Sequence, residues 1–277
     1  MNLKIAFIHI GLSTLLFAGC SSNKNDDETL AETTETTEIT KAIEEQKINA
    51  QNVFNSIPGP DKLADLINQT GLDYEGNLLN DPQNLNKYTS DDAKAINLGV
   101  YGGDMVYANV YEQTQESMLF LRCLNTLCRN LGITNSFDDK TADRLQNNKE
   151  NKDSLLTIVS QSFNRADAFL RENQRHGTSA LMVAGGWVEG LYLSAKVIEK
   201  SKNKRMIQEM SQQKKSLTDL IELVKSGKVN GSTFVLTGLQ NLKTSYDKIQ
   251  DGTTMTDEVF AEINTKVSAL RAKLIAV

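Results

Sequence analysis

The sequence predicts an all-α protein, a single bundle-like domain of about eight helices that follows a disordered tether. All three prolines lie between residues 58 and 82, so the 195 residues from 83 onward contain none of this helix breaker. The same stretch carries apolar side chains that recur every three or four residues, which is the spacing of amphipathic helices. It contains no alternating apolar and polar run bounded by hairpin turn residues, so no strand is expected.

The first half of the predicted domain holds two short helices and two long ones. They are expected near residues 43–55, near 61–69, over 91–111 and over 115–131. Thr114 is the candidate N-cap between the long helices, because a threonine side chain can accept a hydrogen bond from a free N–H of the first turn. Gly132 is expected to end the second long helix, since glycine tolerates the left-handed backbone that often follows a helix.

The second half contains four more apolar stripes with helical spacing. They comprise Leu155, Val159, Phe163, Ala166 and Leu170; Met206, Met210, Leu217, Leu220, Ile221 and Val224; Val235, Leu239, Leu242, Tyr246 and Ile249; and Val259, Ile263, Val267, Leu270 and Leu274. We expect the first stripe to end around His176 and Gly177. The second and third should stop at Gly227 and Gly252, and Thr256 should cap the start of the last.

The N-terminus has the features of a signal peptide. Lys4 supplies a positive charge, and the apolar run over residues 5–17 is shorter than the roughly 20 residues that a membrane-spanning helix needs. The run ends in Ala18-Gly19-Cys20, which resembles the bacterial lipobox, although Phe17 stands where that pattern usually has leucine. The resemblance implies cleavage after Gly19, diacylation of Cys20 and anchoring to the lipid bilayer. The alternative is a plain signal peptide that ends near a cysteine.

Residues 20–42 are predicted to be a disordered tether between the signal peptide of residues 1–19 and the helical domain of residues 43–277. The tether is rich in threonine and acidic residues, and it cannot bury enough apolar surface to offset the entropy of ordering it. Residues 21–50 carry eight acidic and three basic residues, whereas residues 51–277 are almost neutral, with 27 acidic and 26 basic residues.

The acidic run Lys24-Asn25-Asp26-Asp27-Glu28 is similar to the surface-export signal of Bacteroidetes lipoproteins. This resemblance implies an outer-membrane protein exposed at the cell surface, and an ordinary polar linker is the alternative. The body also resembles a group of uncharacterised helical lipoproteins of the Bacteroidetes. That likeness lies in Ile57-Pro58-Gly59-Pro60, Tyr101-Gly102-Gly103-Asp104 and Gly185-Gly186-Trp187-Val188-Glu189-Gly190. It supports a lipoprotein and implies no mechanism.

The composition argues against nucleic-acid binding, which needs clustered basic residues to displace counterions from phosphates. The local basic cluster comprises Lys196, Lys200, Lys202, Lys204 and Arg205. We interpret it as a solvated corner between two helices, where cations favour the negative helix end. No nucleic-acid partner is therefore expected.

Cysteine and histidine usage predicts neither a metal site nor a cofactor. Cys123 and Cys128 would lie about 140° apart on a helix, so we interpret them as small buried apolar groups; a disulfide of another geometry is the alternative. Their spacing matches no zinc pattern, and the chain has no dinucleotide or phosphate-loop fingerprint. His176 is the single histidine beyond the signal peptide, and we interpret it as a dipole partner in the last turn of a helix.

Two glycine-bearing helices are the most unusual feature of the body. Gly99 and Gly103 lie four residues apart, as do Gly186 and Gly190, so each pair shares one helix face. Each glycine costs a helix about 1 kcal/mol relative to alanine, and a close approach of two helix backbones would compensate for that cost. The structural interpretation is therefore that these two helices pack tightly at the centre of the bundle.

The functional interpretation of the same helices is a ligand site. Asp104, Tyr107 and Tyr111 lie in the first helix and Trp187 and Glu189 in the second, so aromatic platforms and carboxylates would suit a small polar ligand. Alternatively, Asp104 simply continues an exposed stripe with Asn97 and Tyr101. We expect a binding or scaffold module, for a polar ligand or a protein partner, rather than an enzyme. The other hypothesis is an envelope enzyme, such as a glycoside hydrolase, that uses Asp104 and Glu189.

Overall fold

The structure, a computed structural model, describes residues 66–277 apart from residues 68, 134–135, 149–150, 230 and 251. All of these belong to one compact unit that spans residues 44–277. The predicted signal peptide, Cys20, the tether and the helix near 43–55 lie outside the described residues. Of the short helix expected near 61–69, the structure describes Leu66 and Ile67, which are helical and buried, and Gln69, which is exposed in a turn.

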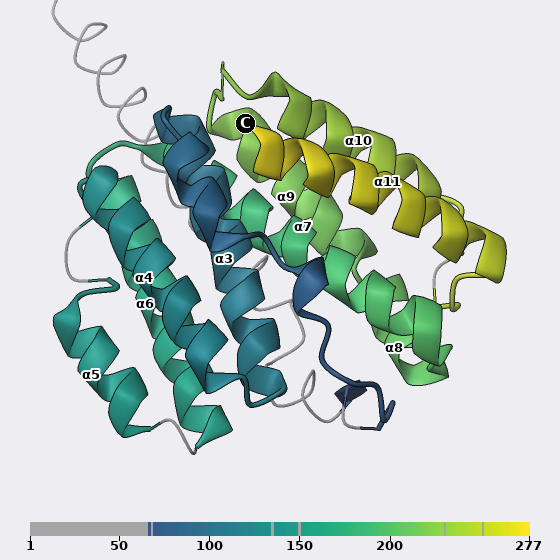
Figure 1. The fold of residues 1–277 in the computed structure, drawn as a ribbon. Coiled ribbons are helices and arrows are strands. Elements are labelled where there is room, and N and C mark those ends of the chain that lie inside the picture. Colours follow the sequence, from purple (N-terminus) through teal and green to yellow (C-terminus); the bar gives the residue numbers. More distant parts are fainter. Residues whose placement is uncertain (1–65, 68, 134–135, 149–150, 230, 251) are drawn as a thin grey trace, which may run out of the picture. The chain divides into compact units, whose positions relative to one another are not determined.

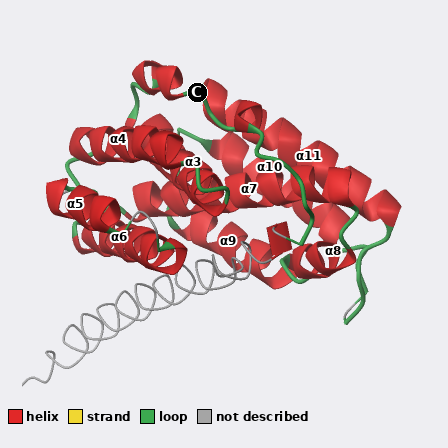
Figure 2. Cartoon of the chain, turned by 60° about the horizontal axis from the view of Figure 1, so that its bottom comes forward, coloured by secondary structure: helices red, strands yellow, loops and turns green. Residues whose placement is uncertain are grey.

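The described residues form helices and contain no strand, which confirms the predicted all-α fold (Figures 1 and 2). The α-helices are α3 (Asp91–Val110), α4 (Thr114–Asn130), α5 (Asp139–Asn147), α6 (Lys152–Glu172), α7 (His176–Ser201), α8 (Lys204–Ser211), α9 (Lys214–Ser226), α10 (Thr233–Tyr246) and α11 (Asp257–Ala276). Two short 3₁₀ segments, η1 (Gly76–Leu78) and η2 (Pro82–Lys87), precede them.

Helices α3 and α7 lie side by side at the centre and touch backbone to backbone (Figure 1). A Cβ atom on Gly99 of α3 would lie 2.1 Å from the carbonyl oxygen of Met182, and one on Gly185 of α7 would lie 2.0 Å from the carbonyl oxygen of Ile96. No side chain fits at either position. The predicted tight contact of the two glycine-bearing helices is therefore confirmed, but on α7 it is made by Gly185. The predicted contribution of Gly190 is wrong, because a Cβ there would meet no described atom within 4 Å.

The other helices cover the central pair from two sides. Helices α4 and α6 pack against α3, and α5 packs against α6. On the other side α9 and α11 pack against α7, and α10 packs against both α9 and α11. The outer helices present to the centre the apolar stripes that the sequence predicted, and Leu170, Leu220, Leu239 and Val267 are fully buried.

Several helix ends follow the predicted capping chemistry. The Ser90 side chain accepts a hydrogen bond from the backbone N–H of Ala93 at the start of α3, and Thr256 does the same for Val259 at the start of α11. Gly132 follows α4 with a φ of +68°, so its predicted role at the end of that helix is confirmed.

Three predicted boundaries are wrong. Thr114 is the first residue of α4 rather than its N-cap, which is Gln113. The stripe from Met206 to Val224 belongs to two helices, because the chain breaks between α8 and α9 at Gln212 and Gln213. Helix α10 ends at Tyr246, well before Gly252.

The predicted position of His176 in the last turn of a helix is also wrong. Helix α6 ends at Glu172, and Gln174 then takes a left-handed conformation, with a φ of 58°, that needs no glycine. The backbone N–H of Arg175 closes this turn by donating to the carbonyl of Leu170. His176 consequently opens α7, at the positive end of a helix dipole.

Helix α7 is long and apolar enough, by length and composition, to cross a membrane. Within its most apolar stretch 72% of the residues are buried inside the body. This burial identifies α7 as the core helix of the bundle. The basic cluster lies, as predicted, at the corner where α7 ends and α8 begins, and there Lys200 forms an ion pair with Glu75.

Candidate functional site

Asp104 and Glu189, the two carboxylates that the sequence singled out, lie together between α3 and α7. A Cβ on Gly103 would come within 3.0 Å of the Glu189 side chain, so this glycine makes room for it. Both carboxyl groups are completely inaccessible to solvent. Fully buried acids are rare unless they are paired, so each of these two requires a partner.

The partner of Glu189 is Arg271 of α11. The Nε atom of Arg271 lies 3.0 Å from Oε2 of Glu189, and its Nη2 lies 3.1 Å from Oε1, which is a bidentate ion pair. The same Nη2 also donates to the carbonyl of Leu78 at 3.0 Å. The guanidinium carbon lies 4.8 Å from the ring centre of Tyr192, so the charge is covered by an aromatic face.

Asp104 has no cation of its own among the described residues. Its Oδ2 accepts a hydrogen bond from the backbone N–H of Asn80 at 3.2 Å, and its Oδ1 finds no donor among the described residues. Burial, and then the charge of Glu189, raise the pKa of Asp104 well above its usual range. Burial also raises the pKa of Glu189, but Arg271 and the hydrogen bonds from its guanidinium act in the opposite direction.

The raised pKa of Asp104 favours its protonated form, which can donate a hydrogen bond to Glu189. Two ionised carboxylates in contact would repel each other in a medium of low dielectric constant. With one proton between them, a neutral acid, a carboxylate and a guanidinium form a buried group of zero net charge. Such a group satisfies the requirements for burying ions inside a protein.

A row of polar side chains continues from this cluster along the contact between α3 and α11. Asn97 donates to the carbonyl of Leu274 at 3.0 Å, and Asn80 donates to Tyr88 at 2.9 Å and to Asn97 at 3.3 Å. Tyr88 in turn donates to the carbonyl of Ile275. We call Asn80, Tyr88, Asn97, Asp104, Glu189 and Arg271 the polar seam. It fastens the C-terminal helix to the central pair.

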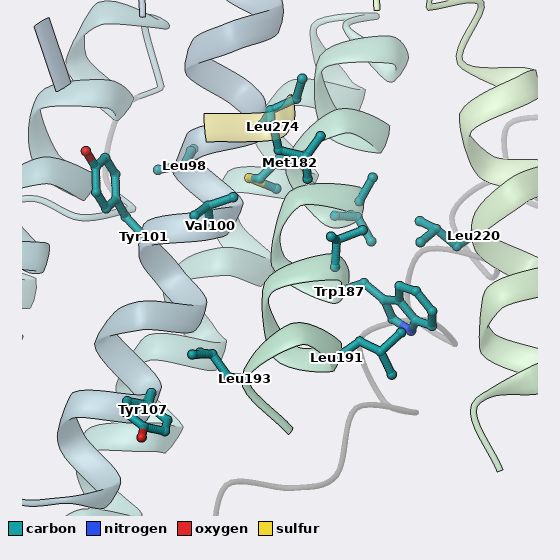
Figure 3. Packing of buried hydrophobic residues seen from close by; sticks show 14 of the residues in the cluster. Leu98, Val100, Tyr101, Tyr107, Met182, Trp187, Leu191, Leu193, Leu220 and Leu274 are labelled. Carbon is teal, nitrogen blue, oxygen red and sulfur yellow. The ribbon is translucent and has the colours of Figure 1, made fainter. Parts of the chain in front are cut away.

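The five predicted site residues do not share one cleft. The rings of Tyr74, Tyr107 and Tyr111 contact one another in tilted arrangements, with ring centres 4.9–5.7 Å apart. Trp187 points away from α3 towards α9, where its Nε1 donates to Ser216 at 2.9 Å; Figure 3 shows it directed at Leu220, on the far side of α7 from Tyr107. The structure therefore brings Asp104 and Glu189 together and separates them from Trp187.

The alternative that Asp104 continues an exposed stripe is wrong, because Asn97, Tyr101 and Asp104 are all fully buried. Arg271 is the principal residue that the sequence analysis missed. The sequence did mark Arg271 as unusual, since it lies four residues after Val267 and next to Leu270 on an apolar helix face. A charged residue in such a position requires a buried counterion.

The cysteines behave as predicted. Cys123 and Cys128 are both buried and not bonded to each other. Burial raises the pKa of Cys123 to about 11 and that of Cys128 to about 12, so both remain thiols at neutral pH. Among the described residues, no group of three or more His, Cys, Asp or Glu side chains is placed to hold a metal ion.

An open groove lies between α8, α9 and the loop before α11, with a volume of about 570 Å³. Most of its lining residues are polar, among them Gln208, Thr218 and Lys215, but carbon atoms make up the larger part of its accessible surface. Unlike the polar seam, this groove is accessible from solvent.

Comparison of the chain with protein-family models, with curated proteins and with solved structures finds no match. The function has to be inferred from the residues themselves.

Proposed function

We propose that this protein is a lipid-anchored protein of the bacterial outer membrane, and that its helical body is a binding or scaffold module. The observation that carries the anchor is Ala18-Gly19-Cys20 at the end of a short apolar run. Two or more acyl chains, at about 0.8 kcal/mol per buried methylene, would hold it firmly on the bilayer. The acidic run that follows Cys20 supports exposure at the cell surface.

The geometry of the polar seam argues against catalysis by Asp104 and Glu189, and equally against a ligand bound at these two residues. A glycoside hydrolase holds its two carboxyl groups roughly 5 Å or more apart, with the scissile bond between them. Here Arg271 engages both oxygens of Glu189, and Asp104 shares its proton with the same carboxylate. Neither group is exposed, so no substrate can reach them without separating α11 from the central helices.

The surface of the body suits polar partners. Among the described residues, Leu119 and Val277 are the large apolar side chains that are exposed, and they are 41% and 37% accessible. A large apolar docking patch would need several such residues together. A polar ligand or the polar face of a protein would instead be recognised by groups such as those that line the groove between α8 and α9.

Metabolic labelling with a clickable fatty acid tests the anchor. The wild-type protein should be labelled and should stay with the membrane fraction, and Cys20→Ala should lose both properties. Cys123→Ala is the matched control and should keep them, because Cys123 is buried in the body. Persistent labelling of the Cys20→Ala variant would refute the proposal.

Surface exposure and catalysis are tested separately. Replacing Asp26-Asp27-Glu28 by alanines should reduce digestion of the protein by protease added to intact cells, without reducing fatty-acid labelling. Unchanged digestion would contradict the export role of the acidic run. Hydrolysis of glycans by the wild type, abolished in Asp104→Asn, would favour the enzyme over the binding module.

A further inference from the structure

The start of α7 gathers hydrogen-bond donors that lack acceptors. No side chain caps this helix, which runs from His176 to Ser201. Arg175 occupies the N-cap position, and its guanidinium donates to the carbonyl of Leu131 and reaches Asp91. The first turn of an uncapped helix presents free N–H groups and a partial positive charge.

A buried arginine lies against this helix start. The Arg171 side chain is 7% exposed, and its Nε donates to both carboxylate oxygens of Asp167 at 2.9 and 3.0 Å. Asp167 also accepts a hydrogen bond from the hydroxyl of Ser179 in the first turn of α7. These contacts fix the guanidinium by its Nε edge beside the helix end.

The remaining edge of the Arg171 guanidinium has no hydrogen-bond partner among the described residues. Its Nη1 and Nη2 are buried, and neither has a hydrogen-bond partner in the part of the chain that the structure describes. They carry the other four of the five N–H donors of the group. An unsatisfied charged donor costs more than a neutral one, so four of them in one place call for an acceptor.

His176 provides another buried polar atom without a hydrogen-bond partner near the start of α7. Its Nδ1 is buried and also lacks a partner among the described residues. Burial, and then the charge of Arg171, lower the pKa of His176 below its ordinary value, and the charge of Asp167 acts in the opposite direction. A neutral imidazole can carry its hydrogen on Nδ1 and so act as one more donor.

We propose that this junction of α6 and α7 is a binding site for an oxyanion, the phosphate or carboxylate group of a ligand, held by Arg171, His176 and the N-terminus of α7. The paired Nη groups of a guanidinium match two oxygens of one such anion. A helix N-terminus supplies backbone donors and a favourable dipole. Asp167 binds the Nε edge of Arg171 and leaves its two Nη groups without a partner among the described residues. The site goes beyond the proposed function and does not depend on the lipid anchor.

Titration of the protein with inorganic phosphate and with acetate, at constant ionic strength, tests the site. The ring resonances of His176 should shift saturably with the anion that binds, and the melting temperature should rise with the same dependence. The resonances of the His176 ring are assigned by their loss in the His176→Gln variant, which separates them from the resonances of His9. A response to phosphate alone would identify a phosphate ligand. A response to both phosphate and acetate would identify a general oxyanion site.

Arg171→Lys should weaken binding by about tenfold or more, because it keeps the charge and the contact with Asp167 but lacks the fork. Arg129→Met, at an exposed arginine in the last turn of α4, should bind as the wild type does. Equal binding in Arg171→Lys and the wild type would overturn the proposal. So would the absence of any shift of the His176 resonances with both anions, a result that needs no variant to fold.

Discussion

Arg271 and Glu189, 82 residues apart in the sequence, form a bidentate ion pair at 3.0 and 3.1 Å in the interior of the bundle. The pair lies where α3, α7 and α11 meet. Asp104 lies beside it as a neutral, protonated acid and adds no second negative charge. The carboxylates that the sequence marked as candidates for ligand binding are in this way committed to one another and to α11. Their properties should be those of a structural core.

Asp104→Asn should change the pH dependence of stability. An amide at this position can still accept from Asn80 and donate to Glu189, so it imitates the protonated acid. Because the pKa of Asp104 is raised on folding, the folded wild type keeps a proton that the unfolded chain loses above the ordinary value of 3.8. The stability of the wild type should therefore fall, relative to the variant, by up to about 1.4 kcal/mol per pH unit as the pH rises above that value.

Urea denaturation of both proteins from pH 4 to pH 9 measures this difference. The two should be similar at pH 4, and Asp104→Asn should be the more stable at pH 8. A difference that stays constant over the whole range would mean that Asp104 is ionised in the folded protein.

The glycines of the central helices should differ sharply in their tolerance of alanine. Gly99→Ala places a Cβ 2.1 Å from the backbone oxygen of Met182, so the two helices must move apart, at a cost of about 3 kcal/mol or more. Gly190→Ala is the matched control, because a Cβ there meets no atom within 4 Å. It should gain up to about 1 kcal/mol from helix propensity.

Thermal or urea unfolding ranks these two variants. Equal stabilities would mean that α3 and α7 do not touch backbone to backbone at Gly99.

Cys123 and Cys128 should resist thiol reagents while the protein is folded. Burial keeps both as thiols, and the thiolate is the reactive form. In a Cys20→Ser chain, Ellman's reagent should give no rapid reaction under native conditions and should release two equivalents in denaturant. Rapid modification of either thiol in the native protein would place it at an accessible surface.

The sequence predicts the fold because each helix carries its own apolar stripe. In α11 the stripe of Val259, Ile263 and Val267 faces the core of the bundle as expected, and Thr256 caps that helix. Boundaries were less predictable where the chain ends a helix without glycine, as it does at Gln174. Helix α5 was missed altogether, because its nine residues are mostly polar and carry no extended apolar stripe.

The site was predictable in part. Local spacing showed that Asp104 and Glu189 belong to glycine-bearing helices, and the glycine faces implied that those helices meet. No local pattern shows which cation neutralises Glu189, because Arg271 comes from the last helix and is placed by the packing of the whole bundle. The separation of Trp187 from Tyr107 similarly depends on which sides of α3 and α7 face each other (Figure 3).

A double-mutant cycle on Glu189 and Arg271, measured by urea denaturation at pH 7, tests most directly whether the polar seam belongs to the core. Arg271→Met alone leaves Glu189 buried without its cation and should lose about 3–5 kcal/mol. The double variant Glu189→Met/Arg271→Met replaces the pair by apolar side chains and should recover most of that loss. Losses that simply add, or an Arg271→Met variant as stable as the wild type, would show that the two side chains are not a buried pair and would contradict the account.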